Sequence, residues 1–302
     1  MTALRDSVER RLSAYVRSLT PRRIRARFDG PVVFANSVPK SGTNLLTHCL
    51  SQFPMLRPSF EHVSMNANRR PGIDEFERKI GATGPGQYTS GHSFYSDERA
   101  SILEAADVRS VLIVRDPRDV VTSHFHYVTE KNTTHRLTDH YQSLDDDHER
   151  LMASIRGVDG AYTRDGDPLE SIGEWMDRFL GWHDTAYTQV VRFEDLIGPK
   201  GGGDRERQRE TVRMIADHLG VDLTPDTVDE VARNTFSADS KTFRKGLIGD
   251  WQNHFTDEHV AAFKEETGDW LVELGYEPDG DWNVSSSEPT DLASLSTVGA
   301  TE

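Results

Sequence analysis

Residues 38–44 form a short segment whose side chains are suited to binding an anion. Lys40 supplies a positive charge, and Ser41 and Thr43 supply hydroxyl donors. The apolar run 32–34 before this segment predicts a strand, and the apolar residues after it predict a helix. A strand that ends in a tight turn exposes consecutive backbone N–H groups at the start of the next helix, where the helix dipole also favours an anion. The segment is therefore expected to bind a phosphate-like group.

The order of these residues differs from that of an ordinary nucleoside-triphosphate loop. That loop has the pattern G-x-x-x-x-G-K-S/T, in which the lysine follows the second glycine. Here Lys40 precedes Gly42, and no Walker pattern fits the chain. The alternative for this segment alone is a plain strand-to-helix turn whose lysine is solvated.

A second segment places a cation at the end of another strand. Four apolar residues, 111–114, predict a buried parallel strand, and Asp116 and Pro117 suit the N-cap and first position of a helix. Arg115 then lies at the carboxyl end of a strand, which is where ligands bind in open α/β sheets. Ser123 follows about two turns into the helix. The alternative is a local Arg115–Asp116 pair with Ser123 as an ordinary surface residue.

A third segment, 242–256, combines adjacent cations with glycines and an aromatic ring. Arg244 and Lys245 precede Gly246, and a second glycine and a tryptophan follow. This composition is typical of a loop that folds over an anionic ligand. The alternative is a basic surface turn before a helix that begins near Thr256.

Together the three segments resemble the nucleotide-dependent sulfotransferases, which take a sulfuryl group from 3′-phosphoadenosine 5′-phosphosulfate (PAPS). The resemblance implies a single α/β domain of P-loop-NTPase-like fold, with a central parallel sheet flanked by helices. It implies that the first loop binds the 5′-phosphosulfate, and that the second and third segments bind the 3′-phosphate. The residues implied to bind PAPS are Lys40, Ser41, Gly42, Thr43, Asn44, Arg115, Ser123, Arg244, Lys245 and Gly246.

The chain departs from the family pattern where the adenine ring is expected. Leu45 stands where many members have an aromatic residue, Gln252 where the third motif commonly has lysine, and Phe193 where a strand-end tyrosine is common. Phe236 is the candidate ring for stacking on adenine, and its alternative role is that of a core residue.

The resemblance also assigns the catalytic groups. His92 follows a predicted strand, 87–91, at the position where family members that sulfate hydroxyls carry a base. A neutral imidazole there takes the proton of the acceptor hydroxyl, and Glu61 or His62 is the fallback base. Lys40 stabilises the leaving oxygen, and Ser123 is implied to hold Lys40 away until the acceptor arrives. No metal is required, because lysine and arginine supply the positive charge.

Length and pattern agree with one α/β domain. The 302 residues are 35% hydrophobic, enough for one large core. The pattern predicts strands near 32–36, 87–91, 110–115 and 188–193, and helices near 172–187, 206–219, 225–234 and 257–273. We expect a domain over 28–282 that contains a polar insertion, 129–170, suited to an acceptor lid, and a disordered tail over 283–302.

Charge and cysteine content limit the environment and the partners. The net charge is −15, and 7 of the 35 basic residues are lysine, which resembles salt-adapted proteins and argues against nucleic-acid binding. Cys49 is the single cysteine, and no apolar run is long enough to span a bilayer, so we predict a cytoplasmic protein. Residues 1–27 predict a basic amphipathic arm that packs on the core, on a second subunit in an oligomer, or on an anionic membrane surface.

The predicted activity is transfer of a sulfuryl group from PAPS to a hydroxyl of a glycan, a glycolipid or another small molecule. Two alternatives remain open. A P-loop kinase would need a Walker lysine and carboxylates that bind a metal. A catalytically inactive PAPS-binding scaffold would lack the base, and His92 with Lys40 argues against it.

Overall fold

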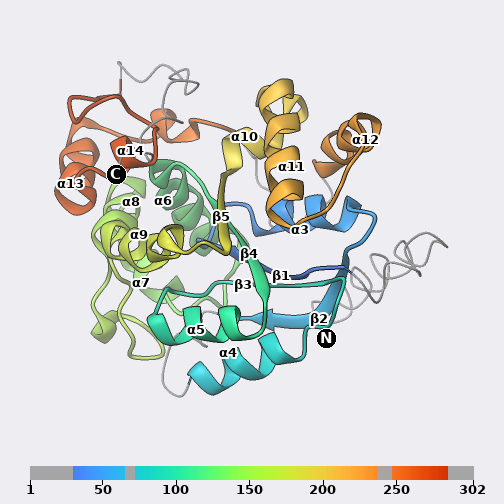
Figure 1. The fold of residues 1–302 in the computed structure, drawn as a ribbon. Helices are drawn as coiled ribbons and strands as arrows, with labels where there is room; N and C mark the ends of the chain where they lie inside the picture. The colour runs from blue at the N-terminus through green and yellow to red at the C-terminus, as the bar shows by residue number, and fades with distance from the viewer. Residues whose placement is uncertain (1–29, 65–71, 237–246, 285–302) are drawn as a thin grey trace, which may run out of the picture. The chain divides into compact units, whose positions relative to one another are not determined.

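The first compact unit of the chain is built around a five-stranded parallel sheet (Figure 1). Figure 1 shows a computed structural model, which describes residues 30–64, 72–236 and 247–284. The strand order is β2-β3-β1-β4-β5, and every neighbouring pair is parallel. The strands are β1 (Val32–Ser37), β2 (Arg57–Val63), β3 (Gln87–Gly91), β4 (Val108–Val114) and β5 (Thr188–Arg192). A mixed α/β domain with a central parallel sheet was predicted, and the fold confirms it.

Helices cover both faces of this sheet (Figure 1). One face carries α4 (Gly72–Gly81) and α5 (Asp97–Ala105). The other carries α3 (Thr43–Gln52), α11 (Arg205–His218) and α12 (Pro225–Thr235), and the short helix α10 (Phe193–Ile197) follows β5. Among the described residues of this unit, η5 (Gly181–Asp184) and η6 (Pro199–Gly201) are 3₁₀ turns. The sheet is thus buried on both sides, which explains why β1 and β4 have nearly continuous apolar sequences.

The second compact unit contains residues 116–177 and, in the described part of the C-terminal region, residues 249–284. Its elements are α6 (Pro117–His126), the π-helical turn η3 (Tyr127–Lys131), α7 (Thr138–Ser143), α8 (Asp147–Arg156), η4 (Gly160–Tyr162), η7 (Asp250–Asn253), α13 (Asp257–Thr267) and α14 (Trp270–Glu273). The remaining helix, α9 (Ile172–Leu180), contains a boundary between the two units.

The polar insertion over 129–170 has more structure than its composition indicates. It contains α7 and α8, and Tyr141, Leu151 and Ile155 are almost fully buried. Its apolar residues are few but are spaced so that each helix has a buried face. The predicted role of this segment as an acceptor lid stays a prediction.

Three element predictions differ from the structure. Strand β2 was missed because Arg57, Pro58 and a polar segment interrupt the apolar pattern, which an edge strand tolerates. The helix predicted to reach residue 187 ends at Leu180, where Gly181, a poor helix former, begins the 3₁₀ turn η5. The helix predicted over 257–273 is two helices, because the chain turns at Gly268 with φ of +52°.

Several predictions concern segments that the structure does not describe. The N-terminal arm 1–27, the tail from residue 285 onward, and Arg244, Lys245 and Gly246 lie outside the described residues. Among the helices that are described, none combines the length and apolar character needed to cross a membrane.

Candidate active site

The loop between β1 and α3 has an unusual backbone conformation at its cation. Lys40 has φ of +71°, in the left-handed region that non-glycine residues seldom adopt, and Gly42 has φ of +102°. The Ser41 N–H donates to the Val38 carbonyl at 3.1 Å, which closes the turn. A left-handed non-glycine residue costs on the order of 1–3 kcal/mol and persists where the surroundings impose it. The fold therefore holds Lys40 in one conformation at the carboxyl end of β1.

The same loop leaves a buried hydroxyl donor for a ligand. Ser41 is 0% exposed, and its Oγ has no hydrogen-bond partner among the described residues. The helix that follows, α3, is N-capped by Gly42, which offers no side-chain oxygen to the first N–H groups. A buried hydroxyl and a helix N-terminus without a side-chain cap together fit an oxyanion such as phosphate.

Gly42 cannot be replaced without disturbing this loop. A Cβ at Gly42 would lie 2.6 Å from Cδ2 of Phe193, and the φ of +102° is strained for any other residue. Because the resemblance implies that this loop binds the donor, we expect Gly42→Ala to weaken binding of adenosine 3′,5′-bisphosphate at least tenfold and to lower the melting temperature. Gly81→Ala is the matched control, because a Cβ at Gly81 meets nothing within 4 Å. Equal binding by the two variants in calorimetry would contradict this account of the loop.

His92 lies at the end of β3, beside the end of β1. Its Nδ1 lies 2.9 Å from the Ser37 carbonyl oxygen and 3.0 Å from the Ser37 Oγ. A carbonyl oxygen only accepts, so Nδ1 carries the proton and donates to it. Nε2 is then the unprotonated nitrogen, which is the one that can accept a proton. This hydrogen bond therefore sets the tautomer that a general base needs.

The surroundings keep the His92 ring neutral. Burial lowers the pKa of His92 below its ordinary value of 6.5, and the charge of Lys40 lowers this pKa further. The hydrogen bond to the Ser37 carbonyl acts in the opposite direction. The two predicted catalytic groups of the first unit, Lys40 and His92, are thus close enough to interact electrostatically.

Ser37 connects the loop to His92, and the sequence reasoning missed it. Its Oγ lies 2.6 Å from the Thr43 Oγ1 and 3.0 Å from the His92 Nδ1. In the sequence, Ser37 is recognisable only as a small polar residue at the end of a predicted strand. Its contact with His92 could not be predicted without knowing that β3 pairs with β1.

The two fallback bases also lie in the first unit. The His62 ring centroid is 5.8 Å from that of His92, with the rings nearly perpendicular, and His62 Nδ1 is 3.0 Å from the Ser90 Oγ. Glu61 lies 3.8 Å from the Arg78 guanidinium. His62 is thus an immediate neighbour of His92, whereas Glu61 has a cation as its neighbour.

Arg115 is anchored at the end of β4. It is 7% exposed, its guanidinium lies 4.6 Å from the Phe193 ring centroid, and its Nη2 donates to the Leu247 carbonyl at 2.7 Å. Leu247 directly follows Gly246 in the chain. The structure therefore brings the backbone that follows the third motif to the cation of the second motif.

The second half of the third segment is held within the second unit. Asp119 accepts hydrogen bonds from the Gly249 N–H at 2.9 Å and the Trp251 N–H at 3.0 Å. Asp116 N-caps α6, as predicted, and pairs with Arg118 at 2.7 Å. The Arg118 guanidinium stacks 4.1 Å from the Trp251 ring centroid. These contacts fix the turn from Gly249 onward against α6.

The positions of the remaining predicted site residues do not indicate a ligand. Ser123 lies on α6 and is half-buried, and Asn44 is exposed near the start of α3. Phe236 follows α12, is half-buried and packs against the core of the first unit. Burial raises the pKa of the Cys49 thiol to about 12, so this residue is not a nucleophile at neutral pH. The nucleotide-binding roles of Asn44, Ser123 and Phe236 stay predictions.

Comparison with known families gives the class of the protein. The profile of the sulfotransferase domain matches residues 31–275, which is most of the chain. The chain belongs to the sulfotransferase family, and the family predicted from the three motifs is confirmed. It is therefore a sulfotransferase.

Individual relatives agree with this assignment. Mouse sulfotransferase 2A6 is 26% identical over 80% of this chain and 83% of its own. The 3-alpha-hydroxysteroid sulfotransferase of Cavia porcellus is 25% identical over 74% and 78%. Among solved structures, mouse sulfotransferase SULT7A1 complexed with PAP has a TM-score of 0.58 at 18% identity, over 83% of this chain and 88% of that chain. Retinol dehydratase in complex with androsterone and inactive cofactor PAP has a TM-score of 0.51 at 15% identity, over 86% and 85%.

Proposed function

We propose that this sulfotransferase moves the sulfuryl group of PAPS to a hydroxyl of a small molecule, with His92 as the base. The observation that carries the proposal is the His92 hydrogen bond to the Ser37 carbonyl, because it leaves Nε2 unprotonated beside an anion-binding loop. Family membership and the complexes of similar structures with PAP support the choice of donor.

The residues at the end of β1 fit the donor. Ser41 offers a buried hydroxyl donor, and the N-terminus of α3 offers backbone N–H groups. Lys40 adds a positive charge that suits the 5′-phosphosulfate, and Arg115 is proposed for the 3′-phosphate. When bound, PAPS supplies a sulfuryl group whose leaving group is adenosine 3′,5′-bisphosphate.

The proposed reaction needs one proton transfer and one group transfer. His92 Nε2 takes the proton of the acceptor hydroxyl as that oxygen forms its bond to sulfur. The bond between sulfur and the bridging oxygen breaks in line, and negative charge grows on that oxygen. Lys40 stabilises this charge more in the transition state than in the ground state, which is the condition for faster transfer.

The proposed acceptor class rests on the names of the relatives and on the hydroxyl acceptor predicted from the sequence. A relative is named as a hydroxysteroid sulfotransferase, and a structural neighbour was solved with retinol. These names favour an apolar alcohol as the first acceptor to test, before the glycan and glycolipid hydroxyls expected from the sequence. Membrane contact, one of the alternatives for residues 1–27, would suit a lipid-like acceptor.

A donor-binding experiment separates this proposal from the kinase alternative. Calorimetry of the full chain with adenosine 3′,5′-bisphosphate should show 1:1 binding, and ATP with Mg²⁺ should neither bind comparably nor displace it. The Ser41→Ala variant should bind more weakly, because the buried hydroxyl donor is lost. Tight binding of ATP with Mg²⁺ and none of the bisphosphate would support a kinase and contradict the proposal.

Ser37 is proposed as a positioning residue, and its hydroxyl can be tested separately from donor binding. We expect Ser37→Ala to lower kcat about tenfold, the equivalent of one hydrogen bond, and to shift the acid limb of the pH–rate profile. Bisphosphate binding should change little, and Ser37→Thr should restore activity because it keeps the hydroxyl. A Ser37→Ala profile identical to that of the wild type would show that the hydroxyl does not position His92.

A further inference from the structure

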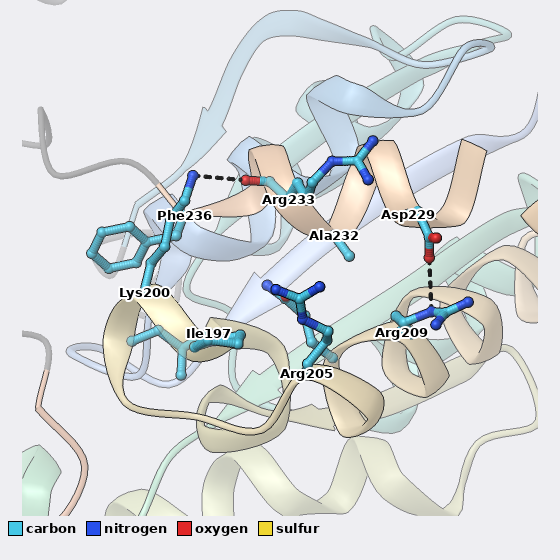
Figure 2. A pocket seen from close by; sticks show the side chains of 10 residues that line it. Ile197, Lys200, Arg205, Arg209, Asp229, Ala232, Arg233 and Phe236 are labelled. Carbon is cyan, nitrogen blue, oxygen red and sulfur yellow. Dashed lines mark hydrogen bonds and ion pairs between the residues drawn. The ribbon is translucent and has the colours of Figure 1, made fainter. Parts of the chain in front are cut away.

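A pocket separate from the proposed donor loop lies between α10, η6, α11 and α12 of the first unit (Figure 2). Its volume is about 100 Å³, or about 540 Å³ when the space that opens to solvent is counted. The residues that line it are Ile197, Pro199, Lys200, Arg205, Gln208, Arg209, Asp229, Ala232, Arg233 and Phe236. The described loop residues 38–44 and Arg115 do not line it.

The lining of this pocket has the opposite charge to the protein as a whole. Lysine and arginine provide four cationic side chains, and among the described residues that line it Asp229 alone is acidic. The whole chain carries a net charge of −15. Clustered cations repel one another, and a bound anion relieves that repulsion. The pocket is thus a local site for an anion on an acidic protein.

The four cations are not equivalent. Arg209 lies 2.7 Å from Asp229 and 3.4 Å from Glu206, so it connects α11 to α12. The Lys200 Nζ donates to the Arg233 carbonyl at 3.1 Å, which uses one of its three N–H donors (Figure 2). In the same view the Arg205 guanidinium lies between η6 and α12. Lys200 and Arg205 are therefore the cations best placed to bind a ligand.

Most of the remaining lining is apolar, and Gln208 is held by a hydrogen bond. Ile197 and Ala232 are buried, and the half-buried Phe236 ring packs on the core. The Gln208 amide donates to the Leu196 carbonyl at 3.0 Å, and Gly198, with φ of +67°, leaves room for it: a Cβ there would lie 2.4 Å from Gln208 Nε2. A ligand here meets apolar surface as well as positive charge.

We propose that this pocket binds a small molecule that joins a phosphate or sulfate group to an apolar ring. The anionic group contacts Lys200 and Arg205, and the ring lies against the apolar wall. Residues 38–44 and Arg115 do not line the pocket, so the inference does not depend on their proposed roles. Among the described residues, Phe236, the candidate for stacking on adenine, is the one predicted donor residue that also lines the pocket.

Calorimetry with two simple probes tests the site and identifies the preferred anion. The full chain, saturated with adenosine 3′,5′-bisphosphate, is titrated with phenyl phosphate and, separately, with benzenesulfonate, whose carbon–sulfur bond prevents sulfuryl transfer. We expect one equivalent of at least one probe to bind, and the tighter probe shows which anion the pocket prefers. The double variant Lys200→Gln/Arg205→Gln should weaken that binding at least tenfold. Glutamine at position 200 can still donate to the Arg233 carbonyl, so the fold should be kept.

A charge-matched control makes the result specific. The double variant Arg78→Gln/Arg213→Gln also removes two positive charges, from exposed side chains of α4 and α11 that do not line the pocket. It should bind the probe as the wild type does. Failure of both probes to bind the wild type, or equal weakening in the two double variants, would overturn the proposal. If the bisphosphate did not bind but a probe did, the proposed function would be contradicted, and the probe result would still test the pocket.

Discussion

Replacement of Lys40 by methionine should lower kcat/KM by roughly 10²–10³-fold, the usual effect of removing one group that stabilises developing charge. Methionine keeps most of the side-chain length but not the charge. It meets the same backbone cost at φ of +71°, so the comparison isolates the ammonium. Most of the loss should appear in kcat, because Lys40 acts most strongly on charge that develops in the transition state.

The measurement is steady-state transfer with wild type, Lys40→Met and a control, Lys264→Met. Lys264 lies on α13, 5.2 Å from the Trp282 ring centroid, so its replacement removes the same charge from a side chain that is not part of the loop. The control should keep nearly full activity. A Lys40→Met enzyme with an unchanged kcat would show that another group stabilises the leaving oxygen.

The same variant makes a prediction about His92. The charge of Lys40 lowers the pKa of His92, so its removal should raise that pKa towards the ordinary value of 6.5. An NMR titration of the His92 ring in the wild type and in Lys40→Met measures this shift without any need for activity. An unchanged His92 pKa would mean that the two groups do not interact as the structure indicates.

Replacement of His92 by asparagine is expected to lower kcat by about 10²–10⁴-fold, the range for loss of a general base. The asparagine amide can still donate to the Ser37 carbonyl, but it cannot take a proton at neutral pH. Binding of adenosine 3′,5′-bisphosphate should therefore change little. The neighbouring His62→Asn is the control, because it removes an adjacent imidazole and leaves His92 in place. A large loss in His62→Asn with little loss in His92→Asn would assign the base to His62 instead.

The pH dependence of the wild type follows from the direction of the His92 shift. The active form is the neutral ring, and burial lowers its pKa below 6.5. The midpoint of the acid limb should thus lie below pH 6.5, and activity should decline as the pH falls through that midpoint, where the ring gains a proton. This acid limb should be absent from the residual activity of His92→Asn.

The parts of the site that the sequence predicted lie at the ends of continuous apolar strands. The apolar runs in the sequence correctly predicted β1 and β4. They therefore also predicted that Lys40 and Arg115 follow the carboxyl ends of these strands. The tight turn in this loop could also be predicted from the spacing of its glycine, lysine and serine, because a tight turn depends on residues that are neighbours in the sequence. Local chemistry was therefore the predictable part.

The parts that were missed depend on which strands are neighbours. Ser37 matters because β3 pairs with β1 and brings His92 beside it, and the order of strands in a sheet is not encoded locally. His62 lies beside His92 because it belongs to β2. This edge strand has a polar sequence, so it was not recognised as a strand. The helices of the 129–170 insertion were likewise hidden, because few apolar residues suffice to bury a short helix on one face.

Transfer of radiolabelled sulfate from PAPS is the direct test of the proposed reaction and of the roles of Lys40 and His92. The full chain would be incubated with labelled donor and separate steroid, retinoid, phenol, glycan and glycolipid acceptors, beside Lys40→Met and His92→Asn. We expect label on one class of hydroxyl acceptor, strongly reduced in both variants. Label transferred equally well by the wild type and both variants would contradict the assigned roles of Lys40 and His92. A folded protein that binds the bisphosphate yet transfers label to no acceptor class would contradict the proposed reaction.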